Sequence, residues 1–516
     1  MPQAKVFTFS LHGVEAVPIE VEIDVTHGLP SFDIVGLPDM AVKESRERVR
    51  SAIKNSGYSF PLQRITINLA PADLRKAGSS FDLPIALGIL VATDQVSNEI
   101  TQNWWWGGEL ALDGSIRPIP GIIAMALAVS KSGQERGISY RFGIPNANFR
   151  EAALVLSAGI APVNSLLDFR NFSKAFACPP PLAFDADAQA PSKEFDDVAF
   201  HNIRGQESTK RALEIAAAGG HHLMMVGPPG SGKTLLARSM TSILPSMTHQ
   251  EKIEVSQIYS VVNLLPPGSG LIQKRPFRAP HHTCSTISLV GGGRIPRPGE
   301  ISLAHHGVLF LDELLEFNRD VLESLRQPLD DGMVTITRLK SVCKFPCSFL
   351  LIAAMNPCPC GYLGDPSHDC TCTQRQISRY QQRVSGPLLD RFDLQVEVPR
   401  IDPFAPDNTA QYASIDIIRK RIDESRQLQR NRLEPYGINC NARMNHSLTE
   451  NLCRLDRESK QLLTHAYKQF GLSMRAHHKL LRISRTIADL AGDEQIASKH
   501  VAEAIQYRCL DRNRDW

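Results

Sequence analysis

The chain begins with apolar and polar residues in alternation. From Val17 to Val25 every second residue is Val or Ile, which is the period of a strand with one buried face. Residues 65–69 predict a further strand, and residues 39–54 mix apolar residues with Lys, Glu and Arg as a surface helix does. Residues 1–176 are therefore predicted to form an α+β domain.

The pattern changes further along the chain. Residues 177–194 are rich in Pro, Ala and Asp, which predicts an extended linker between domains. Residues 195–399 contain short, fully apolar runs that start at Leu223, Val308 and Phe349, with helical segments between them. Such runs indicate the buried parallel strands of an α/β sheet.

The last part of the chain, residues 400–516, predicts mostly helices. The clearest are expected at residues 414–430 and 473–491. The predicted fold class is thus an α/β multidomain protein, with an α+β N-terminal domain, an α/β core and a helical C-terminal lid.

The composition narrows the possible functions. Hydrophobic residues make up 42% and charged residues 22%, the balance of a soluble globular protein. A net charge of +3 gives no overall basic field, so contact with nucleic acid would have to come from local patches. No apolar run reaches about 18 residues, and the start lacks a signal-peptide pattern. Both observations predict a cytoplasmic protein without a membrane span.

A phosphate-binding motif follows the apolar run at Leu223. It fits G-x-x-x-x-G-K-[ST] and opens a predicted helix, which is the context that the motif requires. Its backbone N–H groups and the helix N-terminus would face the phosphates of ATP, while the lysine reaches the β- and γ-phosphates and the threonine ligates Mg²⁺. The motif consists of Gly227, Pro228, Pro229, Gly230, Ser231, Gly232, Lys233 and Thr234.

Two further apolar runs end in polar residues suited to ATP hydrolysis. The first ends in Asp312, expected to hold the Mg²⁺ ion, and Glu313, expected to orient and deprotonate the attacking water. The other ends near Asn356, which is placed to position that water. Parallel strands present their carboxyl ends on one edge of the sheet, so these residues are expected to meet the phosphate-binding motif there.

Together these residues resemble the AAA+ superfamily. Asn356 matches its sensor-1 position, Arg475 its sensor-2 arginine, and residues 203–206 the segment that packs near the base. Arg391 matches the arginine finger that completes the site of a neighbouring subunit. The resemblance therefore implies a ring, usually of six subunits. Taken alone, each arginine is more often a surface ion pair.

Narrower motifs point to one branch of that superfamily. Residues 278–283, 289–293, 298–305 and 356–361 resemble the magnesium-chelatase-like ATPases, and the whole layout is similar to the YifB/ComM group. This resemblance implies an ATP-driven hexameric helicase that promotes branch migration during homologous recombination in natural transformation. Its implied partners are single- and double-stranded DNA, with recombination proteins as possible helpers.

The first domain resembles the Lon protease domain. Residues 76–80 lie where that family has its nucleophile motif, with Ser80 at the serine. A Ser–Lys dyad needs a lysine as base, and the matching downstream segment has Ile123 at the lysine position. We therefore expect a scaffold without proteolytic activity, which helps assembly or binds DNA.

Two cysteine pairs form a candidate zinc site. Their spacing is C-x-C, nine residues, C-x-C, and four thiolates satisfy tetrahedral Zn²⁺. His368 is an alternative to one of the thiolates, and four free thiols or redox-active pairs are the competing interpretation. The expected ligands are Cys358, Cys360, Cys370 and Cys372.

Candidate DNA contacts lie in two segments. Residues 334–340 alternate as a hairpin arm does, and AAA+ relatives carry a pore hairpin in this interval. As a group, the basic residues of both segments would supply phosphate contacts, although each one alone is more often a solvated charge. The candidates are Arg338 and Lys340 in the arm and Lys274, Arg275 and Arg278 in the other segment. The Trp residues at 104–106 are expected to pack in the core rather than to stack on bases.

Two other functions stay open at this point. A chelatase-type ATPase would drive magnesium insertion into a tetrapyrrole together with partner subunits. A Lon-like ATP-dependent protease would use Ser80, and Ile123 at the lysine position weighs against it. Stimulation of ATP hydrolysis by single-stranded DNA, or by a porphyrin with its partners, separates the first alternative from a DNA motor.

Overall fold

The computed structural model describes residues 3–170, 200, 203–265, 270–293, 295–338, 341–401 and 413–508. The predicted linker 177–194 lies outside these residues. The chain divides into two compact units. The N-terminal unit contains Met1–Ser192, Thr248–Gln273 and Thr335–Phe345, and the P-loop unit contains Lys193–Met247, Lys274–Val334 and Pro346–Trp516.

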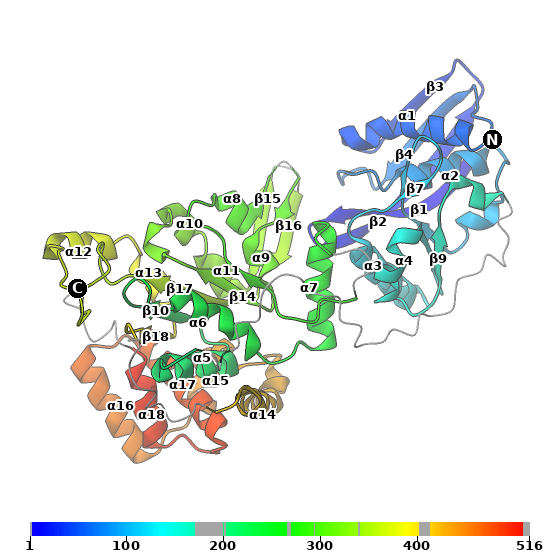
Figure 1. Ribbon diagram of the computed structural model, residues 1–516. Coiled ribbons are helices and arrows are strands. Elements are labelled where there is room, and N and C mark those ends of the chain that lie inside the picture. Colours follow the sequence, from blue (N-terminus) through cyan, green and yellow to red (C-terminus); the bar gives the residue numbers. More distant parts are fainter. Residues whose placement is uncertain are drawn as a thin grey trace. The chain divides into compact units, whose positions relative to one another are not determined.

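The N-terminal unit is built on a seven-stranded mixed sheet with strand order β3-β4-β2-β1-β5-β8-β9. Figure 1 labels five of these strands, β1, β2, β3, β4 and β9. The pairs β1–β2 and β2–β4 are antiparallel, and the other neighbours are parallel. The strands are β1 (Gln3–His12), β2 (Glu15–Thr26), β3 (Ser31–Val35), β4 (Arg64–Ala70), β5 (Trp104–Trp106), β8 (Arg141–Pro145) and β9 (Ile160–Val163). The strands expected at 17–25 and 65–69 are confirmed as β2 and β4.

Helices complete this α+β unit. The surface helix expected at 39–54 is confirmed as α1, which begins after Asp39, whose Oδ1 accepts from the backbone N–H of Val42 at 2.9 Å. The whole of α2 is buried against the sheet. The helices are α1 (Met40–Asn55), α2 (Asp82–Ala92), α3 (Ile122–Arg136) and α4 (Phe149–Ala153), and β6 (Glu109–Leu110) pairs with β7 (Ile116–Arg117).

The three adjacent tryptophans form β5 and pack in the core, as expected. Trp104 and Trp106 point to the same face, with ring centroids 4.9 Å apart. Trp105 points to the other face and stacks on Phe9 at 4.4 Å. All three are at most 4% exposed. Because a strand alternates its side chains, both faces of the sheet gain aromatic area from one short strand.

Two segments from the middle of the sequence belong to the N-terminal unit. The first carries α7 (His249–Val261), where Ser260 O accepts from the N–H of Gly121 at 3.1 Å and Gln257 Nε2 donates to Val14 O at 2.7 Å. The second is the hairpin of β15 (Met333–Arg338) and β16 (Ser341–Pro346), where His12 Nε2 lies 3.1 Å from Val342 O. The hairpin arm expected at 334–340 is thus present and anchored on this unit.

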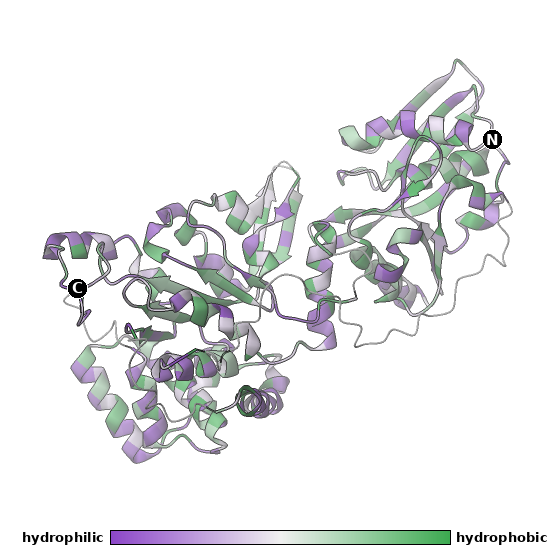
Figure 2. Ribbon diagram, in the orientation of Figure 1, coloured by the Kyte–Doolittle hydropathy of each residue, from purple (hydrophilic) through white to green (hydrophobic). Residues whose placement is uncertain are grey.

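The P-loop unit contains a parallel five-stranded sheet with strand order β11-β14-β17-β10-β18. The expected apolar runs form strands whose residues are all buried, and Figure 2 shows them as predominantly hydrophobic. The strands are β10 (Leu223–Val226), β11 (Phe277–Arg278), β14 (Val308–Leu311), β17 (Leu350–Met355) and β18 (Leu394–Glu397), with a separate antiparallel pair β12 (Gly291–Gly292) and β13 (Arg297–Pro298).

Short helices connect these strands, and longer ones form the C-terminal region. The chain leaves β10 for the far edge, returns strand by strand to β17, and crosses to β18 on the other side of β10. The core helices are α5 (Glu207–Gly219), α6 (Lys233–Ser239), α8 (Thr286–Val290), α9 (Glu300–Leu303), α10 (Arg319–Glu323), α11 (Arg326–Asp331), α12 (Gln374–Gln381) and α13 (Gly386–Leu389). The lid helices are α14 (Ile415–Leu433), α15 (His446–Leu452), α16 (Arg457–Phe470), α17 (Met474–Ala491) and α18 (Ser498–Gln506).

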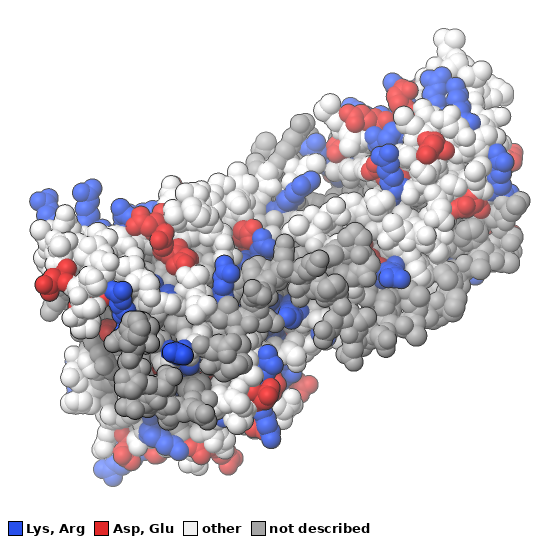
Figure 3. Space-filling model, in the orientation of Figure 1, with Lys and Arg blue, Asp and Glu red and all other residues white. Residues whose placement is uncertain are grey.

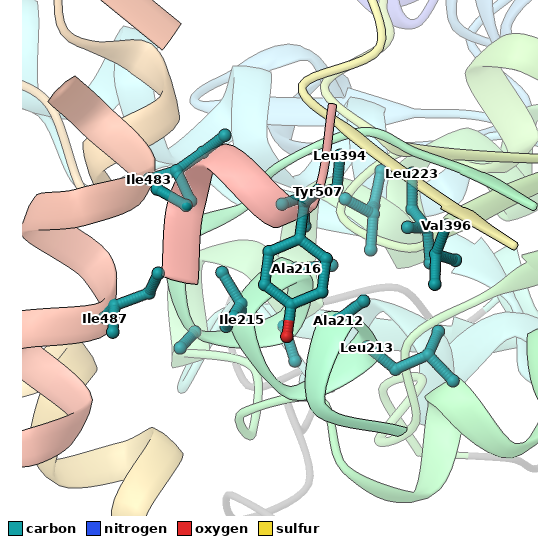
Figure 4. Packing of buried hydrophobic residues seen from close by; sticks show 14 of the residues in the cluster. Ala212, Leu213, Ile215, Ala216, Leu223, Leu394, Val396, Ile483, Ile487 and Tyr507 are labelled. Carbon is teal, nitrogen blue, oxygen red and sulfur yellow. The ribbon is translucent and has the colours of Figure 1, made fainter. Parts of the chain in front are cut away.

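Sheet and lid share one hydrophobic core. In Figure 4, Leu223 and Leu394 of the sheet, Ala216 of α5 and Ile483 of α17 surround Tyr507. Because the C-terminal helices share buried side chains with the sheet, a movement of the sheet is expected to move these helices with it. No helix in the described part of the chain is long and apolar enough to cross a membrane.

Candidate nucleotide site and cysteine cluster

The phosphate-binding loop connects β10 to α6, at the point where the strand order changes direction. Gly230 and Gly232 have φ angles of 76° and 89°, in the left-handed region that favours glycine. At Gly227 a Cβ atom would lie 2.2 Å from Val398 O, so only glycine fits beside β18. The loop is thereby curled at the carboxyl edge of the sheet, where α/β proteins bind ligands.

Lys233 joins this loop to the neighbouring strand. Its Nζ donates to Gly227 O at 2.7 Å, Pro228 O at 2.8 Å and Asn356 Oδ1 at 3.3 Å. Burial lowers the pKa of Lys233 to about 8, against the opposing effect of Asp312 and Glu313. A bound triphosphate would favour the charged ammonium and reverse this shift.

The expected Mg²⁺ ligands also meet. Thr234 Oγ1 donates to Asp312 Oδ2 at 2.6 Å, which places a hydroxyl and a carboxylate from two elements side by side. The other carboxylate oxygen, Oδ1, accepts from the backbone N–H of Glu313 at 3.0 Å. These residues fit Mg²⁺, which prefers oxygen ligands and keeps several waters in its shell.

Glu313 has an unusual backbone conformation directly after β14. Its φ of 51° is left-handed, which for a residue with a Cβ is sparsely populated and clusters at functional sites. The side chain is 56% exposed, and Oε2 lies 3.4 Å from His282 Nδ1. The carboxylate is therefore open to a water molecule and has a histidine neighbour.

His282 and Gln206 contribute to the site in ways that the sequence did not reveal. His282 was part of a family motif without an assigned role, and the structure places it against Glu313. Gln206 Nε2 donates to Pro399 O at 2.6 Å and lies 3.5 Å from Ser231 O, so it ties the loop to the end of β18. Only the resemblance of residues 203–206 pointed to this region beforehand.

The two candidate arginines follow the loop in the sequence, one before β18 and one in α17. Arg391, between α13 and β18, forms a two-pronged ion pair with Asp330 through Nη2 and Nε, and its Nη1 donates to Pro387 O at 2.7 Å. Arg475 is exposed in the first turn of α17. Within the described residues, no hydrogen bond or ion pair joins either arginine to Lys233 or Asp312.

The four cysteines of the candidate zinc site converge. Their sulfur atoms all lie within 4.8 Å of one another, and three of the pairs are 3.3 to 3.6 Å apart. A tetrahedral site with Zn–S bonds of about 2.3 Å has sulfurs about 3.8 Å apart, so the cluster has nearly the required size. The backbone N–H of Tyr362 lowers the pKa of Cys360 to about 6, which favours a thiolate.

His368 is not part of this cluster among the described residues. Its ring stacks on Tyr362 at 4.9 Å, and its Nδ1 lies 3.2 Å from Ser367 Oγ. The residues present therefore fit a Zn²⁺ ion held by Cys358, Cys360, Cys370 and Cys372.

The candidate DNA contacts are placed unevenly. Lys340 and the side chain of Arg338 lie outside the described residues, and Lys274 is exposed. Arg275 donates to the carbonyl oxygens of Pro245, Ser246 and His306, so its guanidinium is used within the chain. Arg278 pairs with Glu300 at 2.6 Å.

Other basic residues form a surface that the sequence did not single out. Figure 3 shows basic and acidic side chains interspersed over the described residues of the visible face. A shallow hollow along α16 gathers basic side chains with a histidine, and its lining includes Arg457, Lys460, His465 and Lys468.

The residues at the Lon-like positions are buried. Ser80 is 9% exposed, and the fully buried Lys76 donates its Nζ to Pro71 O. Ile123, which the resemblance to the Lon family aligns with a lysine, is fully buried in a cluster with Ile253 and Leu271 of the middle segment. The side chain at this position thus packs apolar residues together.

This geometry defines a P-loop nucleotide-binding protein. A family model for magnesium chelatase subunit ChlI matches residues 199–405, one for subunit ChlI of Mg-chelatase matches 21–139, and one for the C-terminal region of that subunit matches 413–508. The competence protein ComM of Haemophilus influenzae is 44% identical over 99% of this chain and 98% of its own length.

Two other relatives show how far the similarity extends. The protein YifB of Escherichia coli is 41% identical over 98% of this chain and 97% of its own length. The magnesium-chelatase subunit ChlI-2 of Arabidopsis thaliana is 23% identical over 60% of this chain and 74% of its own length. The chain belongs to the YifB/ComM group of the magnesium-chelatase-like family.

Proposed function

We propose that the chain is an ATP hydrolase that works as a hexameric ring on DNA, as a helicase that promotes branch migration during natural transformation. The main observation in support is that five side chains lie together at one edge of the parallel sheet: Lys233, Thr234, Asp312, Glu313 and Asn356. The similarity to a competence protein over nearly the whole chain supports the DNA substrate and the link to recombination.

The roles of the residues follow from their positions. Lys233 and the loop amides hold the β- and γ-phosphates, and Thr234 and Asp312 hold Mg²⁺. The metal ion, when bound, neutralises charge that develops on the phosphate oxygens. Glu313 is exposed and accepts the proton of the attacking water, and Asn356, hydrogen-bonded to Lys233, orients that water.

His282 lies next to Glu313, the proposed base. Its Nδ1 is 3.4 Å from Glu313 Oε2, and this close contact restricts the directions that the carboxylate takes. A base held in one direction needs less reorganisation before it accepts a proton. His282 thus acts through Glu313 as a positioning residue.

Arg391 acts, in this proposal, on the ATP of the neighbouring subunit. The transition state of phosphoryl transfer spreads negative charge over oxygens that Lys233 and Mg²⁺ do not fully cover, and an arginine from outside stabilises that charge. In its own chain the guanidinium pairs with Asp330, whose side chain is 54% exposed. The Arg391 side chain itself is only 15% exposed, so it has to leave Asp330 and Pro387 O before it can reach a neighbouring phosphate. Arg475 is proposed to contact the γ-phosphate from the lid of the same subunit.

Zn²⁺ at the four cysteines is proposed to be structural. The site offers four thiolates and no open position, which is typical of structural zinc. The metal ion would order the segment between Asn356 and α12, because the polar residues of this segment cannot form a hydrophobic core of their own.

The test is ATP hydrolysis by purified protein with different effectors. Single-stranded or branched DNA should raise the rate, and the protein should move a labelled strand through a four-way DNA junction when ATP is present. Glu313→Gln provides the matched inactive control. If a porphyrin with chelatase partner subunits stimulates hydrolysis and DNA does not, the motor assignment fails and the chelatase alternative takes its place.

A further inference from the structure

The backbone around Arg391 is held by cations from the C-terminal region. Lys479 of α17 donates its Nζ to Asp390 O and, at 3.0 Å, to Phe392 O. Arg508, which follows α18, donates its Nη1 to Phe392 O at 3.1 Å. The carbonyl groups on both sides of Arg391 are therefore fixed by the lid rather than by the sheet.

A buried ion pair strengthens this connection. Lys479 Nζ lies 3.2 Å from Asp393 Oδ1, and both side chains are only 8% exposed. On the other side, Asp393 Oδ2 lies 3.2 Å from His221 Nδ1. Burial alone would raise the pKa of Asp393, but Lys479 and His221 bring it well below its ordinary value. The carboxylate thus remains charged near neutral pH, and the pair persists.

Helix α17 carries Arg475 and Lys479 one turn apart. Residues four positions apart lie on the same face of a helix, separated by about 6 Å along its axis. Arg475 is exposed at the helix start, and Lys479 is buried on the segment that carries Arg391. A displacement of this helix at Arg475 is passed to Lys479, because a packed helix moves as a rigid element.

We propose that Lys479 is a positioning residue that couples the lid of each subunit to the arginine that the same subunit offers to its neighbour. Nucleotide contact at Arg475 moves α17, Lys479 moves the segment from Asp390 to Asp393, and Arg391 leaves Asp330 for the neighbouring site. The inference rests on two parts of the proposed function: the action of Arg391 across the subunit boundary, and the contact of Arg475 with the γ-phosphate in its own subunit. The coupling would act in one direction around the ring, since nucleotide in one subunit's site sets the rate of hydrolysis in the site of its neighbour.

The experiment uses full-length chains mixed into one ring. Arg391→Ala chains keep an intact phosphate-binding loop and Glu313. Glu313→Gln chains bind ATP without turnover and keep an intact Arg391. Hydrolysis in the mixture comes from interfaces where a Glu313→Gln chain, with ATP bound, offers its arginine to an Arg391→Ala chain. The double substitution Lys479→Met with Asp393→Asn is then placed in one type of chain at a time. It removes both charges together, since a single removal leaves an uncompensated buried charge.

In the chain that offers the arginine, the double substitution should lower hydrolysis by about tenfold or more, because a finger is worth ~10³–10⁵ in rate. In the Arg391→Ala chain it should lower hydrolysis far less, because that chain has no arginine to misplace. Lys479→Arg should retain most activity in either chain. Thermal unfolding and ATP binding of each variant establish that it is folded.

The control is a second ion pair between core and lid. Arg211 of α5 and Glu503 of α18 lie 2.8 Å apart, and among the described residues no hydrogen bond or ion pair joins either side chain to residues 390–393. Glu214, the other partner of Arg211, also pairs with Arg421 and so keeps a cation when Arg211 is replaced. Arg211→Met with Glu503→Gln should act equally in both chains. Equal effects of the Lys479 and Asp393 double substitution in the two chains would overturn the coupling alone. Failure of the unsubstituted parents to restore hydrolysis in any ratio, although they share rings, would overturn the trans role of Arg391 and the coupling with it.

Discussion

At the scale of single residues, the proposed roles assign nucleotide binding and turnover to different side chains. Lys233 contacts the loop carbonyls, whereas the Glu313 side chain is 56% exposed and lies next to His282. Glu313→Gln should therefore bind ATP as wild type does and hydrolyse it more slowly by about 10²-fold or more, since only the base is lost. Lys233→Ala should weaken binding itself. Fluorescent-nucleotide titration and steady-state hydrolysis measure both effects, and equal loss of binding in the two variants contradicts these roles.

The lowered pKa of Lys233 predicts a pH-dependent affinity. Without nucleotide the ammonium loses its proton near pH 8, and bound phosphates raise the pKa again. ATP binding then takes up a proton, so the affinity should fall as pH rises above about 8, by at most about tenfold per pH unit. Lys233→Arg stays charged over this range and serves as the control. Calorimetry in buffers of different ionisation enthalpy measures the proton uptake directly, and the same slope in Lys233→Arg would show that another group titrates.

Residue-level prediction from sequence succeeded where the pattern is local. The loop 227–234 and the strand-end pair Asp312 and Glu313 follow their strands directly, so the strand positions also placed the side chains. The contacts of His282 with Glu313 and of Arg391 with Asp330 join residues 31 and 61 positions apart. Such contacts depend on how the connections fold back, which periodicity does not specify.

At the scale of elements, the cysteine segment is proposed to be an insertion that a metal ion orders. Purified protein should contain about one Zn²⁺ per chain, because four thiolates stand at nearly tetrahedral spacing. Cys358→Ser with Cys370→Ser should release it and lower the melting temperature, whereas Cys284→Ser, outside the cluster, should retain it. Metal analysis of protein purified without chelators provides the measurement. Absence of zinc from such protein would favour the free-thiol interpretation.

The segment around α7 depends on Ile123. This side chain is fully buried with Ile253 and Leu271, and its removal leaves a cavity that neighbours fill only in part. Ile123→Ala should lower the free energy of unfolding by ~2–4 kcal/mol and speed amide hydrogen exchange in α7. Leu127→Ala, at the edge of the same cluster, should cost less. Unchanged exchange in α7 would show that Ile123 does not hold this helix.

The helices and strands themselves were largely predictable from the sequence. The unit to which α7 and the hairpin β15–β16 belong was not. The apolar runs gave β10, β14 and β17, and alternation gave β2 and β4. Nothing in the pattern of α7 or of the hairpin β15–β16 shows that they belong with the N-terminal unit. The apolar residues of these segments could pack into the core of either unit. Which core they join depends on how well their side chains fit its shape, which the sequence pattern does not specify.

At the scale of the whole molecule, the N-terminal unit is expected to be a scaffold. Ser80→Ala should leave ATP hydrolysis and strand exchange at wild-type rates, because no lysine base occupies the position of Ile123. Wild-type protein should not cleave a denatured casein substrate with ATP. Cleavage by wild-type protein that disappears in Ser80→Ala would establish a protease after all. The matched control is Glu313→Gln, in which the same serine is intact and hydrolysis is blocked.

Because α7 and the hairpin β15–β16 both belong to the N-terminal unit, the two units cannot be separated by cutting the gene at one point. Three separate stretches of chain build the N-terminal unit, so its polypeptide is interleaved with that of the P-loop unit. A nick at an engineered protease site within residues 177–194 should leave a particle that elutes as one species and still hydrolyses ATP. Deletion of the first 192 residues would instead strip the cover from Ile253 and Leu271, and the remaining fragment should aggregate. Independent expression of this ATPase core would require the two interleaved stretches to be replaced by short polar turns.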